Sequence, residues 1–135
     1  MKSSKCKPSD KRRGAAVVEF AVCLPLLMLI ILGSIEATHG IFLKQALSAA
    51  AYEGIREASI TNSTTAEARA RAENVLRSRQ VKKFGVVFSP SDITKAARGT
   101  PIAIELSAPI SSNSPFIGQV IGDRVVRLRS VMVKE

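Results

Sequence analysis

The stretch from Lys11 to Ile35 reads Lys-Arg-Arg-Gly-Ala-Ala-Val-Val-Glu-Phe-Ala-Val-Cys-Leu-Pro-Leu-Leu-Met-Leu-Ile-Ile-Leu-Gly-Ser-Ile, and it decides the fold of this 135-residue chain. Its last 21 residues begin at Ala15, and Glu19 is the only charged one among them. A helix of that length is about 32 Å long, which is enough to cross a bilayer core of about 30 Å. The stretch lacks the polar face that a surface helix of a soluble domain shows. It therefore predicts a membrane-spanning helix.

Glu19 is the unusual residue of this stretch. An ionisable side chain costs about 2.5–3.5 kcal/mol at the centre of a membrane helix, and less near the interface. One interpretation is that Glu19 lies near the headgroups and its carboxylate reaches water. The other is that the carboxylate has a function. The surrounding residues favour a function, because a basic run ends in Gly14 and Glu19 is the fifth residue after that glycine.

This arrangement resembles a type IV prepilin signal, in which a short basic leader and a glycine precede an apolar helix with glutamate at its fifth position. The resemblance implies that a prepilin peptidase cuts between Gly14 and Ala15 on the cytoplasmic side of the membrane. It also implies that the remaining helix is an assembly surface. Glu19 of one subunit would neutralise the new amino terminus of a neighbour, while Phe20 and the apolar run would pack helix against helix.

Further motifs along the first helix narrow the resemblance to one family. They are Arg13 to Ala21, Leu24-Pro25-Leu26-Leu27, Gln45-Ala46-Leu47, Ala50-Ala51, and Glu53 to Ala58. Together they are similar to the TadE-like family, pseudopilin-type proteins of the tight-adherence (Flp) pilus secretion machinery, over roughly residues 12–60. The resemblance implies a minor pilin or pseudopilin. The implied partners are a prepilin peptidase, the major Flp-type pilin, a sibling minor pilin and an inner-membrane assembly platform.

The charge distribution predicts the orientation of the chain. Its net charge is +9, and residues 1–14 account for +5 of it. A basic excess suggests nucleic acid or a membrane surface as the partner, but a basic cluster beside an apolar helix marks a cytoplasmic amino terminus. We therefore expect a basic cytoplasmic leader without regular structure at 1–14, a transmembrane helix at 15–36, and one extracytoplasmic domain at 37–135; the resemblance implies that the membrane is the bacterial inner membrane. Binding to nucleic acid is not expected.

Two other interpretations of the apolar run remain open. An ordinary secretory signal would be cleaved after the run, near Thr38-His39-Gly40, where no Ala-x-Ala motif occurs. Alternatively, the chain is an unprocessed single-span membrane protein whose outer domain acts as a scaffold in an envelope complex. Processing after Gly14 would distinguish a pilin from such an anchor.

The remaining residues predict an α+β domain. Helical spacing of apolar residues extends the first helix to about Ser59. Small residues at 46, 49, 50, 51, 54 and 58 either let the backbone of another chain approach or pack only on their own domain. Residues 61–65 are good helix caps, and a second helix is expected over 66–80.

Three later segments alternate apolar and polar residues with period two, at 84–88, 102–106 and 126–132. They predict an antiparallel sheet of about three strands, covered on one face by the two helices. The predicted fold is therefore pilin-like, with a long amino-terminal helix laid on a small sheet. The loop Ser111 to Pro115 is expected to be exposed.

The sequence contains no recognisable catalytic or metal-binding motif. His39 is the only histidine, Cys6 lies in the leader, and Cys23 lies in the apolar run. We therefore expect neither a transition-metal site nor a Ser-His-Asp set, and no glycine-rich phosphate loop occurs. We expect no enzymatic activity and no cofactor.

Overall fold

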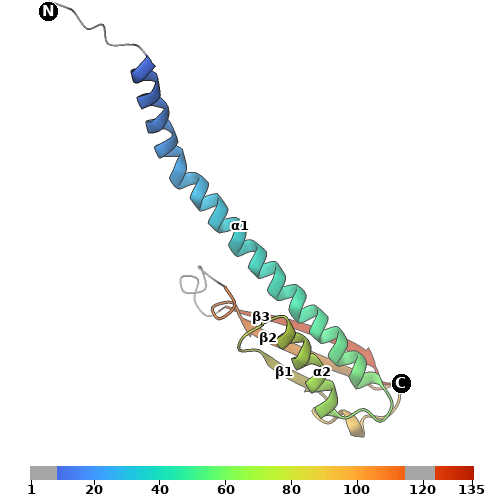
Figure 1. The fold of residues 1–135 in the computed structure, drawn as a ribbon. Coiled ribbons are helices and arrows are strands. Elements are labelled where there is room, and N and C mark those ends of the chain that lie inside the picture. Colours follow the sequence, from blue (N-terminus) through green and yellow to red (C-terminus); the bar gives the residue numbers. More distant parts are fainter. Residues whose placement is uncertain (1–8, 115–123) are drawn as a thin grey trace, which may run out of the picture. The chain divides into compact units, whose positions relative to one another are not determined.

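The computed structural model describes residues 9–114 and 124–135, with the backbone alone at 9–13. The described elements are the helices α1 (Ser9–Ser59) and α2 (Thr65–Ser78), the strand β1 (Gly85–Ser89), the short 3₁₀ helix η1 (Ile93–Lys95), and the strands β2 (Pro101–Pro109) and β3 (Val125–Val133), as Figure 1 shows. A long apolar helix, a second helix and a three-stranded sheet confirm the predicted α+β fold. The chain divides into two compact units between Ile35 and Glu36.

The first unit contains the amino-terminal part of α1. This helix begins at Ser9, six residues before Ala15, although residues 1–14 were expected to lack regular structure. Lys and Arg are good helix formers, and extending an existing helix avoids the cost of nucleation. The helix also continues through Pro25. Further along, the Ser34 hydroxyl donates to the Ile30 carbonyl at 2.8 Å, which satisfies a polar side chain inside the apolar run.

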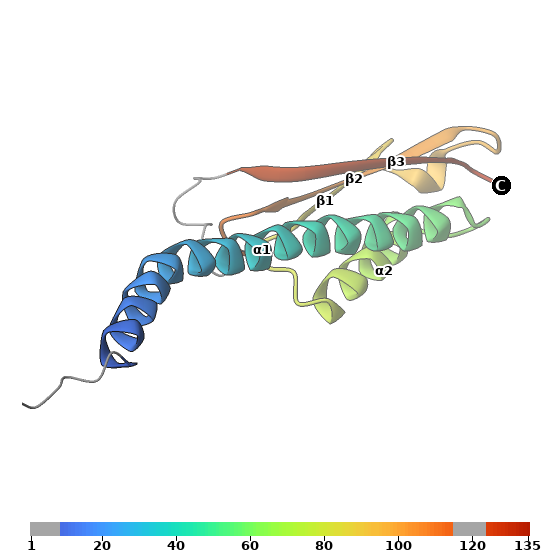
Figure 2. The ribbon, with the colours of Figure 1, turned by 90° about the horizontal axis from the view of Figure 1, so that it is seen from above.

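The second unit, from Glu36 onward, has two layers. Its part of α1 and α2 cover one face of the sheet, as Figure 2 shows. The core contains small residues of the two helices and larger residues of both layers. Its largest fully buried side chains are Leu47, Ile55, Leu76, Ile93, Ile102, Ile104 and Leu106. The stripes predicted on α2 and on the strands therefore face this core.

The sheet is antiparallel, in the order β1-β2-β3. Glu105 of β2 lies opposite Val87 of β1 and Arg129 of β3. Proline is found at both ends of β2, where its missing N–H matters least. Pro101 and Pro109 lie beyond the five residues of β2 that pair with β1, and a strand tolerates proline where no ladder bond is needed.

A capping box starts α2. The Thr64 hydroxyl accepts a bond from the Glu67 N–H at 3.2 Å, and the Glu67 carboxylate accepts one from the Thr64 N–H at 2.9 Å. This reciprocal pair satisfies two N–H groups that a bare helix end leaves unpaired. The bond from the Thr64 backbone, followed by that from its hydroxyl, lowers the pKa of the Glu67 carboxyl below its usual value. The predicted capping segment is thus correct.

Lys134 stabilises the end of the sheet in a way that the sequence did not predict. It is buried, and its Nζ donates to the Ile93 carbonyl at 2.6 Å. The next residue, Glu135, donates its N–H to the Ser59 carbonyl at 3.0 Å. These bonds connect the residues after β3 to η1 and to the end of α1.

The small residues on the outer half of α1 pack within their own domain. Ala46, Ala50, Ala51 and Ala58 are buried there. At Gly54 the approach is closest, because an added Cβ would lie 2.9 Å from the Ala72 Cβ and 2.8 Å from the Ile104 Cδ1. Of the two interpretations of this face, intramolecular packing is therefore the one observed.

We predict that Gly54→Val lowers the free energy of unfolding by about 2 kcal/mol, since overpacking of a close contact typically costs about 1–3 kcal/mol. Gly40→Ala is the matched control on the same helix, because a Cβ added at Gly40 would meet no atom within 4 Å. It should stabilise the domain by up to about 1 kcal/mol, the helix preference of Ala over Gly. Urea unfolding in detergent followed by circular dichroism measures both effects. Equal stability of the two variants would contradict the close contact.

Candidate functional site

The apolar part of α1 presents its side chains outward on all sides. An 18-residue window of the helix has a mean hydropathy of 2.7, and none of that window is buried in the chain. Phe20, for example, is 61% exposed, although a phenyl ring gains from burial. A core helix of a soluble domain would be covered by its own chain. By length and composition, α1 is therefore a helix that could cross a membrane.

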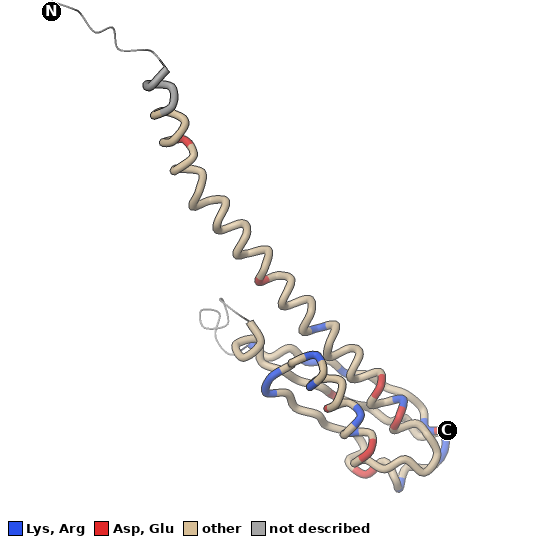
Figure 3. Tube along the Cα trace, in the orientation of Figure 1, with Lys and Arg blue, Asp and Glu red and all other residues tan. Residues whose placement is uncertain are grey.

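Glu19 is the one charge on this surface. It is exposed, and its carboxylate forms no hydrogen bond or ion pair with any other described side chain. Figure 3 shows how few charged positions lie along this part of α1 compared with the sheet and α2. On a helix, Ala15, Val22 and Cys23 share the face of Glu19, and all three are uncharged. Within the part of the chain whose side chains are described, the geometry therefore presents a carboxylate without a partner on an apolar face.

The predicted processing site lies one turn before this carboxylate. Gly14 and Ala15 are helical, and no atom lies within 4 Å of a Cβ built on Gly14. The space beside the Gly14 Cα is therefore open, although a protease must unwind the helix to extend it. Glycine favours such local unwinding, since it costs about 1 kcal/mol in a helix relative to alanine. All four predicted site residues, Gly14, Ala15, Glu19 and Phe20, thus lie on two consecutive turns of α1.

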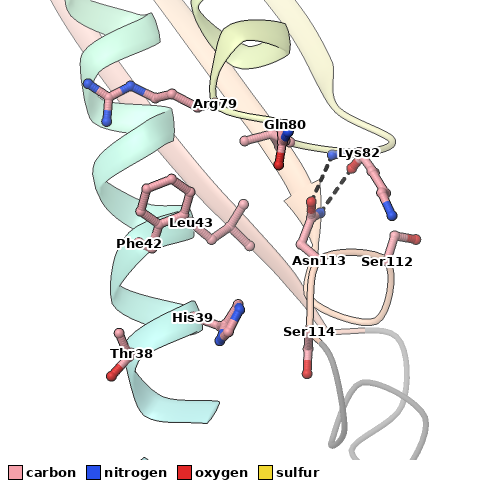
Figure 4. A pocket seen from close by; sticks show the side chains of 11 residues that line it. Thr38, His39, Phe42, Leu43, Arg79, Gln80, Lys82, Ser112, Asn113 and Ser114 are labelled. Carbon is pink, nitrogen blue, oxygen red and sulfur yellow. Dashed lines mark hydrogen bonds between the residues drawn. The ribbon is translucent and has the colours of Figure 1, made fainter. Parts of the chain in front are cut away.

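A second candidate site is an open cavity of about 580 Å³ in the second unit. It lies between α1, the segment after α2 and the loop after β2 (Figure 4), and its lining includes His39, Phe42, Leu43, Gln80 and Ser112. The Asn113 side chain closes one side. It accepts from the Lys82 N–H at 2.7 Å and donates to the carbonyls of Lys82 and Pro109 at 2.9 Å each.

This cavity does not assemble a recognisable catalytic set. Neither a carboxylate nor a cysteine is among the residues that line it, so the lining does not supply the acid of a Ser-His-Asp set. Across residues 14–114 and 124–135, no group of three or more His, Cys, Asp or Glu side chains is arranged to hold a metal ion.

Two polar residues near this site have roles that the sequence did not predict. Asn113 lies in the loop expected to be plainly exposed, yet the described part of that loop, residues 111–114, is half-buried. Pro115 of the same prediction lies outside the described residues. The Glu36 carboxylate, placed at the end of the predicted span, accepts a bond from the Ser114 hydroxyl. These contacts join residues far apart in the sequence, and no local pattern signals them.

The sequence of α1 matches a known family. The profile of the TadE-like proteins matches residues 14–56. The resemblance inferred from the motifs is therefore confirmed over this segment, which contains the apolar run, Glu19 and the small residues up to Gly54. Comparisons with curated proteins and with solved structures give no match. The TadE-like segment thus covers all but the first few residues and the last turn of α1.

We predict that Cys23, which is exposed in the isolated chain, is shielded by lipid in native membranes. A charged, membrane-impermeant reagent does not enter hydrocarbon, because burying an unpaired charge there is costly. In a Cys6→Ser background, a membrane-impermeant maleimide should therefore label Cys23 only after denaturation. The control is Ser91→Cys, with both native cysteines replaced by serine, since position 91 is exposed in the second unit. Rapid labelling of Cys23 in intact membranes would contradict a membrane-spanning α1.

Proposed function

We propose that the chain is a minor pilin or pseudopilin that takes part in assembling a tight-adherence (Flp, type IVb) pilus and in the secretion or adhesion associated with it. The observation that supports this most is a carboxylate that pairs with no other described side chain, on an apolar stretch of helix that the chain leaves uncovered, in the segment that matches the TadE-like proteins. Such a helix is suited to lateral packing against other apolar helices. It offers no group for catalysis, and we propose that the chain is not an enzyme.

In this proposal, the leader lies in the cytoplasm and the second unit lies outside the inner membrane. A prepilin peptidase cuts between Gly14 and Ala15. Ala15 then carries a cationic amine, at a helix end that already has positive character. Glu19 of a neighbouring subunit pairs with that amine, since an unpaired charge is costly in a low dielectric. The pair sets the axial register between subunits, while Phe20 packs between helices.

In the same geometry, the amine of its own chain competes with the amine of a neighbouring subunit for Glu19. Within one chain, Glu19 lies about one helical turn from Ala15, so the carboxylate can also approach its own amine. Pairing between subunits is favoured when packing of Phe20 and the apolar run brings the neighbour close and excludes water. The Glu19 pair therefore works only together with the apolar surface around it. The implied neighbours are the major Flp-type pilin and a sibling minor pilin, assembled on an inner-membrane platform.

A second function is favoured by one observation. Because α1 is already helical at Ser9, the bond between Gly14 and Ala15 lies inside a helix rather than in an extended segment. Proteases bind extended substrates more readily than helical ones. The alternative is therefore an unprocessed single-span protein whose outer domain serves as a scaffold in an envelope complex.

We predict that Glu19→Ala and Glu19→Gln leave cleavage largely intact and reduce incorporation into, or assembly of, the pilus at least tenfold. Removing one partner of a buried ion pair costs about 3–5 kcal/mol, because the other charge stays unpaired. Glu19→Asp is the matched control and should restore part of the assembly. Immunoblots of sheared pili and of membranes separate assembly from processing. Normal piliation with Glu19→Ala would exclude the pairing role.

A further inference from the structure

The outer edge of β3 presents an unpaired row of backbone groups. The Lys134 N–H bonds to the Thr100 carbonyl at 3.0 Å, and the Ile110 N–H bonds to the Arg124 carbonyl at 2.8 Å. Because bonded pairs alternate along an antiparallel ladder, the even-numbered residues of β3 bond to β2. The N–H and C=O groups of Val125, Arg127, Arg129, Val131 and Val133 therefore point away from the sheet. No strand in the described parts of the chain pairs with them.

Apolar surface flanks this edge on both faces of the sheet. On the outer face, Val125, Val131 and Val133 are 46%, 56% and 54% exposed. On the inner face, Leu128 and Met132 are only half-buried, since the helices cover β2 more completely than β3. A long, exposed edge of this kind is a template for strand pairing. A strand added there would cover apolar side chains on both faces.

The other edge of the sheet is a poorer template. β1 has five residues, against nine in β3, and Pro90 follows it directly. Proline offers no N–H for pairing and ends the usable edge. Strand addition is therefore expected at β3.

The charges on β3 select the kind of strand that can pair. Arg127 and Arg129 are exposed on the outer face, and β3 itself contains no acidic residue. Glu105 of β2 lies opposite Arg129, and both side chains are exposed on the outer face, so Glu105 neighbours one of the two arginines. If two copies paired antiparallel along the full length of β3, Arg129 would lie opposite Arg129. Like charges directly opposite destabilise a strand pair, so these arginines disfavour a second copy.

We infer that the free edge of β3 docks an extended segment of a different protein, which adds as a fourth strand. That segment carries acidic side chains at alternating positions facing Arg127 and Arg129, and apolar side chains facing Val125, Val131 and Val133. The same two arginines thus attract the partner and repel self-pairing, so that specificity arises from both effects. The inference depends on the second unit alone and stands whether or not Glu19 acts in pilus assembly.

The test is site-specific photocrosslinking of the full-length protein in native membranes. A benzophenone amino acid replaces Val133 at the edge, and Val87 is the control position, an exposed valine on β1 of the same sheet. The inference predicts an adduct at position 133 whose cross-linked peptide comes from another protein and has acidic residues at alternating positions. An adduct with a second copy, a peptide without that pattern, or no adduct at 133 would overturn it.

Two variants test the cause of the crosslink. Arg127→Glu with Arg129→Glu should reduce the adduct at least tenfold, whereas Arg69→Glu with Arg98→Glu, the same charge change at exposed positions elsewhere, should leave it unchanged. Val131→Pro removes an N–H that points to the free edge and should also reduce the adduct, while Val131→Ala should not. Thermal unfolding checks that each variant is folded. If Val131→Pro fails to fold, the variant with Arg127→Glu and Arg129→Glu is the deciding test. An unchanged amount of adduct in that variant would overturn the inference.

Discussion

One helix has to satisfy two environments, and the rest of the structure depends on this constraint. From Ala15 to Ile35, α1 carries a single charged residue, Glu19, and none of its hydrophobic window is covered by the chain. Beyond Glu36 the same helix buries only one face, made largely of alanine and glycine, against α2 and the sheet. The first pattern requires lipid or other helices as its surroundings, and the second requires a domain. The change of pattern along one helix therefore sets the division of the chain.

Small residues determine how closely the second unit packs. Gly54 admits Ala72 and Ile104 to distances that any side chain would prevent. Larger residues then fill the space on either side, from Leu47 to Ile55 on α1 and from Ile102 to Leu106 on β2. The two helices cover β2 more fully than β3, so apolar side chains along the β3 edge stay partly exposed. Close packing at the centre and apolar exposure along this edge are thus consequences of the same arrangement.

Periodicity predicted the fold, because each element has a strong local pattern. The end of α1 at Ser59, the stripe of α2 and the inward residues of all three strands follow from spacing alone. The helical turn before Ala15 was missed, since polar basic residues carry no apolar pattern although they form helix well. The bonds of Lys134, Asn113 and Glu36 were also missed. Each joins segments distant in the sequence. Lys134 does continue the alternation of β3, in which even-numbered residues such as Met132 face inward.

For the candidate site, the sequence predicted the position of the residues but not their interactions. The spacing of Gly14 and Glu19 suggested it, and the structure adds that Glu19 has no partner among the described side chains. The role of that carboxylate depends on a neighbouring subunit and on a cut peptide bond, so its own chain cannot display it. The most direct measurement is therefore the amino-terminal residue of the protein purified from native membranes, by intact mass and terminal sequencing. The account predicts a chain that begins at Ala15; a chain that retains residues 1–14 would contradict it.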